Sequence, residues 1–306
     1  MGTFGTVKLV SDSIVFNEVN LARAMDSLLL AVNMGVSTYI DSSAISLSNA
    51  QNTLIKTGIE NYDKHFDINL TKSLEVMETT KGMFNVFIKP LVDYWGFGDL
   101  NQRNLFQKDS LAIDSILKCI RITDMLIADT SGCRKLDFSA IAKGYGVDAV
   151  AYYLESLGIQ NYMVEIGGEV HCKGKNADGN VWRLGIEEPN EETRSIFEVV
   201  ALHNKSMATS GNYRNFKVLE NGQKVVHIIN PKTGYPEISN LLSASIIADD
   251  CMSADAYATA CMVMGVDTCF QFLLNHTELE GYLIYSNEAG ALQVKATEGF
   301  MRMIVE

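Results

Sequence analysis

Short segments in which apolar and polar residues alternate follow one another from residue 162 to residue 297, with turn residues between them. Alternation with a period of two predicts strands that bury one face. The strands predicted here are 162–170, 182–188, 197–203, 216–230, 241–248 and a final hairpin formed by GYLIYS and ALQVKAT. Asn221-Gly222 is a typical hairpin turn within the fourth segment. Helical patterns interrupt this series, so we expect an α+β fold with abundant antiparallel strands.

The rest of the chain adds helices and further strands. Apolar residues at helical spacing predict helices over 18–35, 70–80, 139–157, 253–264 and 267–275, with Gly35 and Gly265 ending two of them. Further strands are predicted at 3–10, 113–120, 125–128 and 134–137. No internal repeat or low-complexity linker is visible. We therefore expect a single domain over 1–306, with mixed, largely antiparallel sheets and flanking helices.

The charge balance limits the partners. The 306 residues carry 25 Lys and Arg against 37 Asp and Glu, a net charge of −12. This disfavours nucleic-acid binding, which needs a basic surface. No apolar run reaches the length of a membrane span, so membrane attachment would need an anchor outside this chain. The six cysteines form no C-x-x-C pair, and buried, unreactive thiols of a reducing compartment are expected for most of them.

Two glycines lie inside the helix predicted at 139–157. Gly144, Gly146 and Ala149 match the G-x-G-x-x-A pattern of dinucleotide-binding proteins, and Glu165 follows 21 residues after Gly144. That pattern needs a strand directly before its first glycine, whereas here the helix has already begun, so we do not expect a nicotinamide-dependent oxidoreductase. Glycine within a helix costs about 1 kcal/mol relative to alanine. The position therefore predicts close approach of a neighbouring backbone or a ligand.

Several polar residues have both a functional and an ordinary interpretation. Lys143, near a helix start, suits a phosphate or a solvated surface position. Gly167-Gly168 marks a ligand approach or a simple turn, and Thr209-Ser210-Gly211 a phosphate site or a Ser/Thr turn. His227 ends a strand before a proline-rich turn, which suits a general base or an ordinary packed or surface histidine. Asp255 and Thr259, four residues apart, suit Mg²⁺ or helix capping.

The order of the motifs is more specific than any one of them. They are MGTFGTVKL at the start, GMFNVFIKPLVDYWGFG, LDFSAIAKGYGVD, EIGGEV, WRLGIEEP, TSGNYRNF, HIINPKTGYP and SADAYATACMVMG, and they run from residue 1 to residue 265. In this order and spacing the chain resembles the ApbE family, the FAD:protein FMN transferases. The resemblance implies Mg²⁺-dependent transfer of the FMN half of FAD to a threonine or serine hydroxyl of a flavoprotein, with release of AMP.

The resemblance also assigns residues. It implies Mg²⁺ ligation by Asp255, Thr259 and the backbone carbonyl of Ala140, with His227 as the base. The residues implied to contact FAD are Met1, Tyr39, Phe84, Asn85, Asp137, Lys143 and Ile229. The acceptors implied are subunits of sodium-pumping NADH:quinone reductases, of Rnf complexes (together, Nqr/Rnf-type acceptors) or of related reductases.

Alternatives and location stay open at this point. An FAD pyrophosphatase would use the same metal site with water in place of the threonine, and a non-catalytic FAD-binding protein would bind FAD without turnover. Many family members carry a lipoprotein signal before the first motif. The resemblance therefore implies the extracytoplasmic face of the bacterial inner membrane with the leader removed, whereas unpaired cysteines would favour the cytoplasm.

Overall fold

The computed structural model describes residues 2–10, 17–51, 63–98, 110–120, 133–190, 195–212, 216–218, 224–237 and 239–305. The chain divides into two compact units. Unit 1 comprises Met1–Leu30, Ala140–Arg214 and Ser239–Glu306, and unit 2 comprises Ala31–Ser139 and Asn215–Ile238. Since each unit is assembled from segments distant in sequence, no single cut in the chain separates them. The expectation of one domain over 1–306 stays a prediction.

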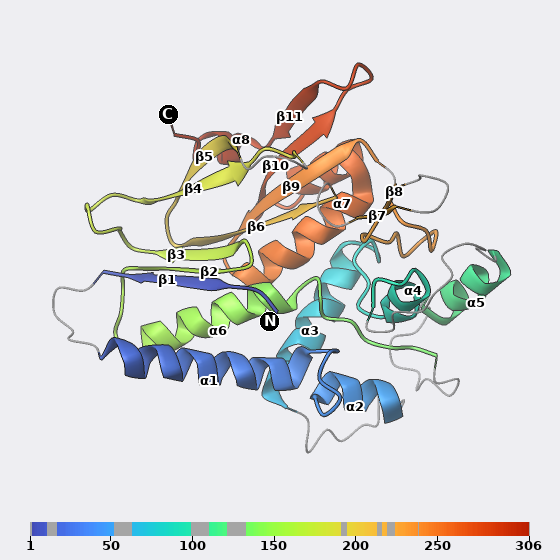
Figure 1. Ribbon diagram of the computed structural model, residues 1–306. Coiled ribbons are helices and arrows are strands. Elements are labelled where there is room, and N and C mark those ends of the chain that lie inside the picture. The colour runs from blue at the N-terminus through green and yellow to red at the C-terminus, as the bar shows by residue number, and fades with distance from the viewer. Residues whose placement is uncertain are drawn as a thin grey trace. The chain divides into compact units, whose positions relative to one another are not determined.

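Unit 1 is built on a seven-stranded sheet (Figure 1). Its strands, in spatial order, are β1 (Gly5–Leu9), β2 (Tyr162–Ile166), β3 (Glu169–Lys173), β6 (Lys205–Gly211), β9 (Leu241–Ala248), β10 (Glu280–Ser286) and β11 (Leu292–Ala296). Every neighbouring pair is antiparallel. The predicted α+β class is confirmed.

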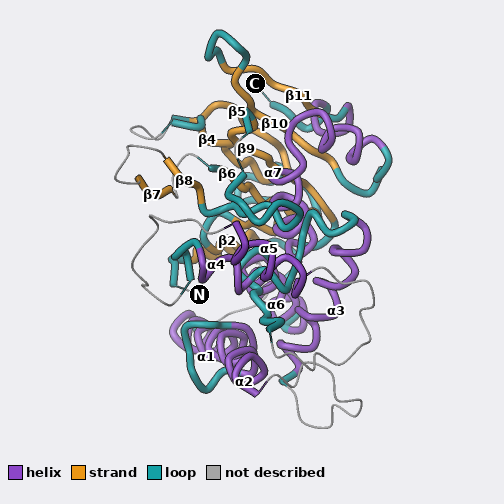
Figure 2. The backbone as a smooth tube through the Cα atoms, turned by 90° about the vertical axis from the view of Figure 1, so that its right-hand side faces the viewer, coloured by secondary structure: helices purple, strands orange, loops and turns teal. Residues whose placement is uncertain are grey.

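Both faces of this sheet are covered. Helices α6 (Ala142–Ser156) and α7 (Cys251–Leu274) pack against one face, as Figure 2 shows for α7, and apolar residues of α1 (Glu18–Val36) join them. On the other face lies the β4–β5 ribbon (Trp182–Glu187 and Ile196–Leu202), with α8 (Glu298–Met301) close by. Alternation in β2 explains the two cores, because Val164 faces the helices and Met163 faces the ribbon.

Helix α7 bends where the sequence predicts a helix end. Gly265 has φ of 72°, a left-handed conformation that glycine adopts without strain, and two helical stretches meet there. By length and composition α7 is the one described helix that could cross a membrane. Its first half is buried against β6 and β9, however, so its apolar character is that of a core helix.

Unit 2 is mainly helical and corrects several predictions. Its elements are α2 (Ala44–Gln51), α3 (Lys64–Thr79), α4 (Lys89–Tyr94), α5 (Ser110–Ile120) and the hairpin strands β7 (Phe216–Val218) and β8 (Lys224–Val226). The strand predicted at 113–120 is wrong, since α5 buries Ile113, Leu117 and Ile120 at helical spacing. The strand predicted at 134–137 is reduced to one bridge, between Ile88 and Lys135. The predictions at 125–128 and Asn221-Gly222 lie outside the described residues.

Gly35 does not end its helix as predicted. Helix α1 continues to Val36, and a methyl group at Gly35 would lie 2.8 Å from Cβ of His65 and 3.0 Å from the backbone nitrogen of Phe66. The glycine is thus needed for close approach of the start of α3. That helix begins before the predicted residue 70, because Asp63 caps it by accepting the backbone N–H groups of His65 and Phe66.

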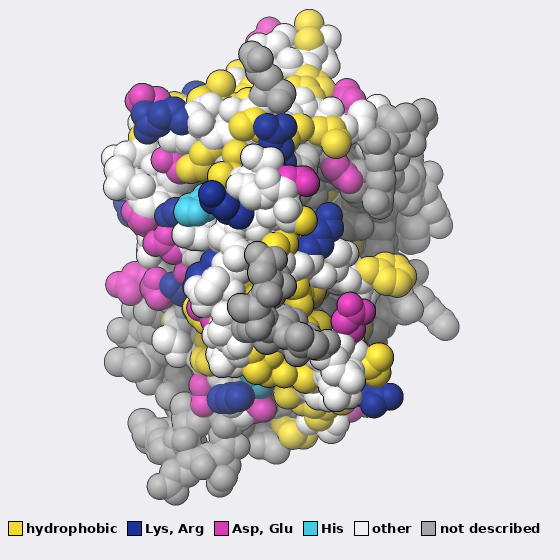
Figure 3. Space-filling model, turned by 90° about the vertical axis from the view of Figure 1, so that its left-hand side faces the viewer, with side chains coloured by type: hydrophobic (Ala, Val, Ile, Leu, Met, Phe, Trp, Pro, Cys, Tyr) yellow, Lys and Arg dark blue, Asp and Glu magenta, His cyan; other side chains and the backbone are white. Residues whose placement is uncertain are grey.

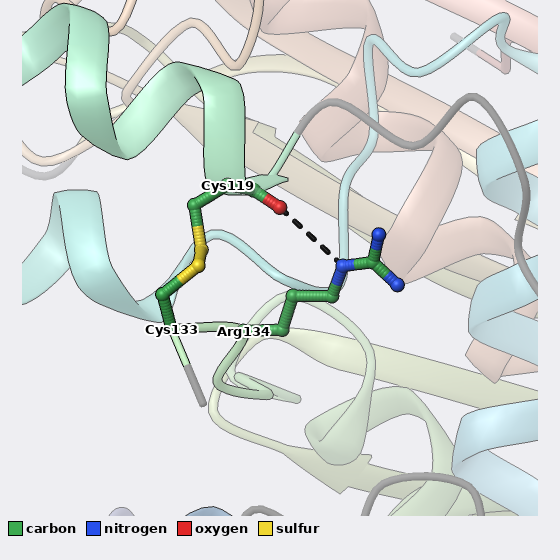
Figure 4. The surroundings of a disulfide bond; sticks show 3 residues. All are labelled: Cys119, Cys133 and Arg134. Atoms are coloured by element: carbon green, nitrogen blue, oxygen red, sulfur yellow. Dashed lines mark hydrogen bonds between the residues drawn. A yellow bond between two sulfur atoms is a disulfide. The ribbon is translucent and has the colours of Figure 1, made fainter. Parts of the chain in front are cut away.

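Two of the six cysteines form a disulfide in unit 2, which the sequence did not predict. Cys119, near the end of α5, is bonded to Cys133, and their Cα atoms are 6.0 Å apart (Figure 4). Nε of Arg134 donates to the Cys119 carbonyl at 3.4 Å. The remaining four cysteines are free and buried, as expected. The disulfide removes the cysteine-based argument for a reducing compartment.

Candidate functional site

The N-termini of α6 and α7 meet in unit 1. The carboxylate of Asp255 in α7 accepts the backbone N–H of Gly144 in α6 at 3.0 Å. In return, Asp148 of α6 accepts the N–H groups of Cys251 and Met252, both at 2.8 Å. The two helices therefore cap each other, and each cap places a carboxylate where a helix dipole favours negative charge.

Gly144 makes this contact possible. A methyl group there would lie 2.7 Å from the carbonyl carbon of Cys251 and 2.8 Å from Cα of Met252. The prediction of close approach at this glycine is confirmed, and the neighbour is a backbone rather than a dinucleotide. Because Gly144 lies within α6 instead of in a turn after a strand, the G-x-G-x-x-A match has no dinucleotide-binding geometry.

Two of the three implied metal ligands project from α7. Asp255 and Thr259 lie one helical turn apart, as predicted, and Asp255 is only 3% exposed. The Thr259 hydroxyl lies 3.2 Å from that of Ser210 on β6. Ala140, whose carbonyl is the third implied ligand, lies in the turn before α6. Unit 1 thus contains all three implied ligands.

A buried carboxylate that sequence reasoning did not single out completes the group. Glu169, at the start of β3, is 3% exposed and pairs through Oε1 with Nζ of Lys143. Its Oε2 is buried and has no hydrogen-bond partner among the residues that the structure describes. The EIGGEV motif contained the residue. Its position directly after Gly167-Gly168 was the available signal, because the two glycines form the turn between β2 and β3.

These groups shift one another's pKa values. Burial raises the pKa of Glu169 above its ordinary value, Asp255 adds to the rise, and Lys143 opposes it. Burial also raises the pKa of Asp255, against the effects of Lys143 and the Gly144 N–H. Burial acts to lower the pKa of Lys143, but Asp255 and Glu169 raise it above its ordinary value. Two buried carboxylates thus share one cation, and more positive charge would stabilise both.

This donor set fits a hard divalent cation. A carboxylate, a hydroxyl and a backbone carbonyl are the oxygen ligands that Mg²⁺ prefers, and Mg²⁺ commonly keeps few protein ligands beside water and substrate phosphates. The described residues contain no group of three His, Cys, Asp or Glu side chains that could hold a metal. A bound cation would also add positive charge beside Asp255 and Glu169, on both of which Lys143 acts, so the charges of these described residues suit a divalent cation.

Unit 2 brings together part of the implied FAD-binding set. The backbone N–H of Asp137 donates to the Val86 carbonyl at 2.8 Å, which places Asp137 beside the segment of Phe84 and Asn85. Phe84 is buried, whereas the amide of Asn85 donates to the Ile120 carbonyl at 3.4 Å. The Asp137 carboxylate accepts the N–H of Ser139 at 2.8 Å.

The segment with His227 is held by a rigid turn. His227 is half-buried just after β8, and Ile229 is buried and forms a bridge with Pro236. Asn230 organises the turn by accepting the N–H of Lys232 at 2.8 Å. The Gly234 carbonyl accepts the indole N–H of Trp95 at 2.8 Å. The predicted strand end and turn around His227 are both present.

The remaining predicted residues are less well defined. Tyr39 is 75% exposed at the surface of unit 2, and Met1 lies outside the described residues. Thr209, Ser210 and Gly211 belong to strand β6, so neither a phosphate-binding turn nor an ordinary turn describes them. The Thr209 hydroxyl instead lies 2.8 Å from that of Ser245 in the neighbouring strand.

The surface view is consistent with the acidic composition. On the face shown in Figure 3, basic side chains are interspersed with acidic ones, and the coloured residues form no continuous basic area.

Comparisons with known proteins agree on one family. The model of the ApbE family matches residues 1–283. A protein of Haemophilus influenzae named FAD:protein FMN transferase is 35% identical over 99% of this chain and 89% of its own length. The solved flavin transferase ApbE from Vibrio cholerae is 30% identical, covers 99% of this chain and 96% of its own, and superposes with a TM-score of 0.85. The Pseudomonas stutzeri flavinyl transferase ApbE, solved in an apo form, is 26% identical over 99% of this chain and 94% of its own, with a TM-score of 0.84.

Proposed function

The chain belongs to the ApbE family, and from this premise we propose that it transfers the FMN moiety of FAD to a threonine or serine hydroxyl of a flavoprotein, with release of AMP. The observation that carries the proposal is the set of polar groups around the buried carboxylate of Asp255 in unit 1. Asp255, Thr259 and the Ala140 carbonyl offer hard oxygen ligands, and Lys143 adds a cation beside them. Such a group suits a pyrophosphate.

The proposed reaction breaks one phosphoanhydride bond and forms one phosphoester bond. The acceptor oxygen attacks the phosphorus of the FMN half, a ring nitrogen of His227 takes the hydroxyl proton, and AMP leaves with the bridging oxygen. Lys143 binds phosphate oxygens and offsets their charge. Mg²⁺ held by Asp255, Thr259 and the Ala140 carbonyl would supply further positive charge for the leaving phosphate. Phe84, Asn85, Asp137, Ile229, Tyr39 and Met1 are proposed to contact FAD.

A flavinylation assay tests this function. The protein is incubated with FAD and Mg²⁺, with and without a flavoprotein subunit of the sodium-pumping reductase or Rnf type, and AMP and covalent flavin are measured. We expect AMP release that depends on the acceptor, and a yellow acceptor whose mass rises by that of FMN less one water. Fast AMP release without the acceptor would identify an FAD pyrophosphatase instead. Binding of FAD without turnover would identify a carrier.

We also propose that the protein acts at the extracytoplasmic face of the bacterial inner membrane. The Cys119–Cys133 disulfide supports this location, because such bonds persist in oxidising compartments. In protein isolated with free thiols blocked, Cys119 and Cys133 should carry no blocking group and should become open to alkylation only after reduction. Complete alkylation of both cysteines in protein taken directly from cells would contradict the location.

A further inference from the structure

Lys143 and Glu169 form an ion pair that joins the start of α6 to the start of β3. Glu169 lies at the first position of β3 and Lys143 at the second position of α6, and the pair is buried at the glutamate end. The stem of Lys143 runs past the glycine turn, because a methyl group at Gly167 would lie 3.4 Å from Cδ of Lys143. The stem of Lys143 thus lies near the β2–β3 turn, and its ammonium group is paired with Glu169.

A contribution to folding stability does not by itself explain why Lys143 and Glu169 are paired here. A buried ion pair must offset the loss of hydration of both charges, and apolar replacements are often as stable. Hydrogen bonds offset the lost hydration of Glu169 only in part, because its Oε2 has no partner among the described residues. The second carboxylate nearby, Asp255, is equally buried and interacts with both members of the pair. The arrangement therefore points to a ligand rather than to the core.

A second ion pair between the same two elements provides the contrast. Glu155 of α6 and Lys173 of β3 are joined at 2.9 Å, with the residue types exchanged between helix and strand. Both of their side chains are about one-third exposed, whereas that of Glu169 is 3% exposed. Both pairs link α6 to β3. What distinguishes the first pair from an ion pair that only joins the two elements is the burial of Glu169 and of nearby Asp255.

We propose that Glu169 is a positioning residue, which holds the ammonium group of Lys143 beside Asp255 so that it meets the pyrophosphate of FAD. A lysine has four rotatable bonds and its ammonium group has no fixed direction, unlike a guanidinium fork. The salt bridge to Glu169 removes most of that freedom before the substrate binds. This inference rests on the proposed function, since it assigns Lys143 to the phosphates of the same substrate.

A double-mutant cycle with Glu169→Gln and Lys143→Met tests the role. Glu169→Gln should lower kcat for FMN transfer by about 10-fold or more, because the cation is no longer fixed. Its affinity for FAD, followed by flavin fluorescence, should fall about fivefold, while its affinity for riboflavin, which has no phosphate, stays unchanged. In the Lys143→Met background, Glu169→Gln should add little to either loss.

The controls separate positioning from folding. Glu155→Gln breaks the other α6–β3 ion pair and should leave kcat and FAD affinity unchanged, with thermal unfolding measured for each variant. If Glu169→Gln does not fold, Glu169→Asp, which keeps the charge, enters the cycle in its place. Equal losses from the Glu169 substitution with and without Lys143, or equal losses of FAD and riboflavin affinity, would overturn the proposal.

The two proposals can fail separately. If the wild-type protein transfers no FMN to an acceptor but FAD affinity shows the coupling between Glu169 and Lys143, the proposed function is wrong and the positioning role stands. If the wild-type protein transfers FMN and the cycle shows no coupling in kcat or FAD affinity, the function stands and the positioning role is wrong.

Discussion

Asp255→Asn should reduce the rate of FMN transfer by about 10³-fold while the protein stays folded. The substitution removes the carboxylate charge that would hold a divalent cation, since an amide oxygen is a weak ligand for Mg²⁺. It keeps an oxygen that can accept the backbone N–H of Gly144, which Asp255 accepts at 3.0 Å. The cap on α6 is therefore retained, and the loss of activity reports on the metal site. The measurement is AMP release and covalent flavin at increasing Mg²⁺ concentrations.

A substitution of the same kind in the same helix provides the control. Asp267 lies in the second half of α7 and forms an exposed ion pair with Lys295. Asp267→Asn should leave the rate and its Mg²⁺ dependence unchanged, since exposed ion pairs contribute little. A wild-type rate in Asp255→Asn would show that Asp255 serves only as the cap of α6, and an equal loss in both variants would show that the loss does not report on a metal site.

His227→Ala should slow transfer by about 10²- to 10⁴-fold, the usual contribution of a general base. Removal of the imidazole leaves the acceptor hydroxyl without a group that takes its proton, whereas the proposed phosphate and metal ligands in unit 1 are untouched. FAD affinity should therefore stay within about threefold of wild type, so the loss appears in kcat. The measurement is single-turnover FMN transfer together with a fluorescence titration of FAD.

Two further observations make this test specific. Added imidazole should restore part of the rate in His227→Ala, because a free base can occupy the space left by the side chain. His203, which is exposed in unit 1, supplies the control, and His203→Ala should transfer FMN at the wild-type rate. An unchanged rate in His227→Ala would remove this residue as the base, and a large loss of FAD affinity would make it a binding residue.

Local sequence patterns predicted the elements of unit 1 well. Alternation predicted β9 over 241–248, and a helix broken at Gly265 was expected from the glycine alone. The strand predicted at 113–120 was wrong, since Ile113 and Leu117, four residues apart, lie on the buried face of helix α5. The turn at Gly234 lies close to this helix, since a methyl group there would meet Leu117.

In the candidate site, too, contacts within one helix were predictable from the sequence, and contacts between distant segments were not. Asp255 and Thr259 could be paired from the sequence, because a helix places residues four apart on one face. Glu169 could not be paired with Lys143, nor Asp148 with the start of α7, because no periodic rule connects residues 26 or 103 positions apart. Such pairs exist only when packing brings the elements together.

The sequence by itself determined the family, the α+β class and the helical pairing of Asp255 with Thr259, because these depend on motif order and on contacts within one turn. It also determined that Gly144 must be approached closely. The tertiary structure decided what approaches it, the mutual capping of α6 and α7, the burial of Glu169 and the Cys119–Cys133 bond. These features depend on the free energy of packing distant segments together, which short-range patterns do not encode.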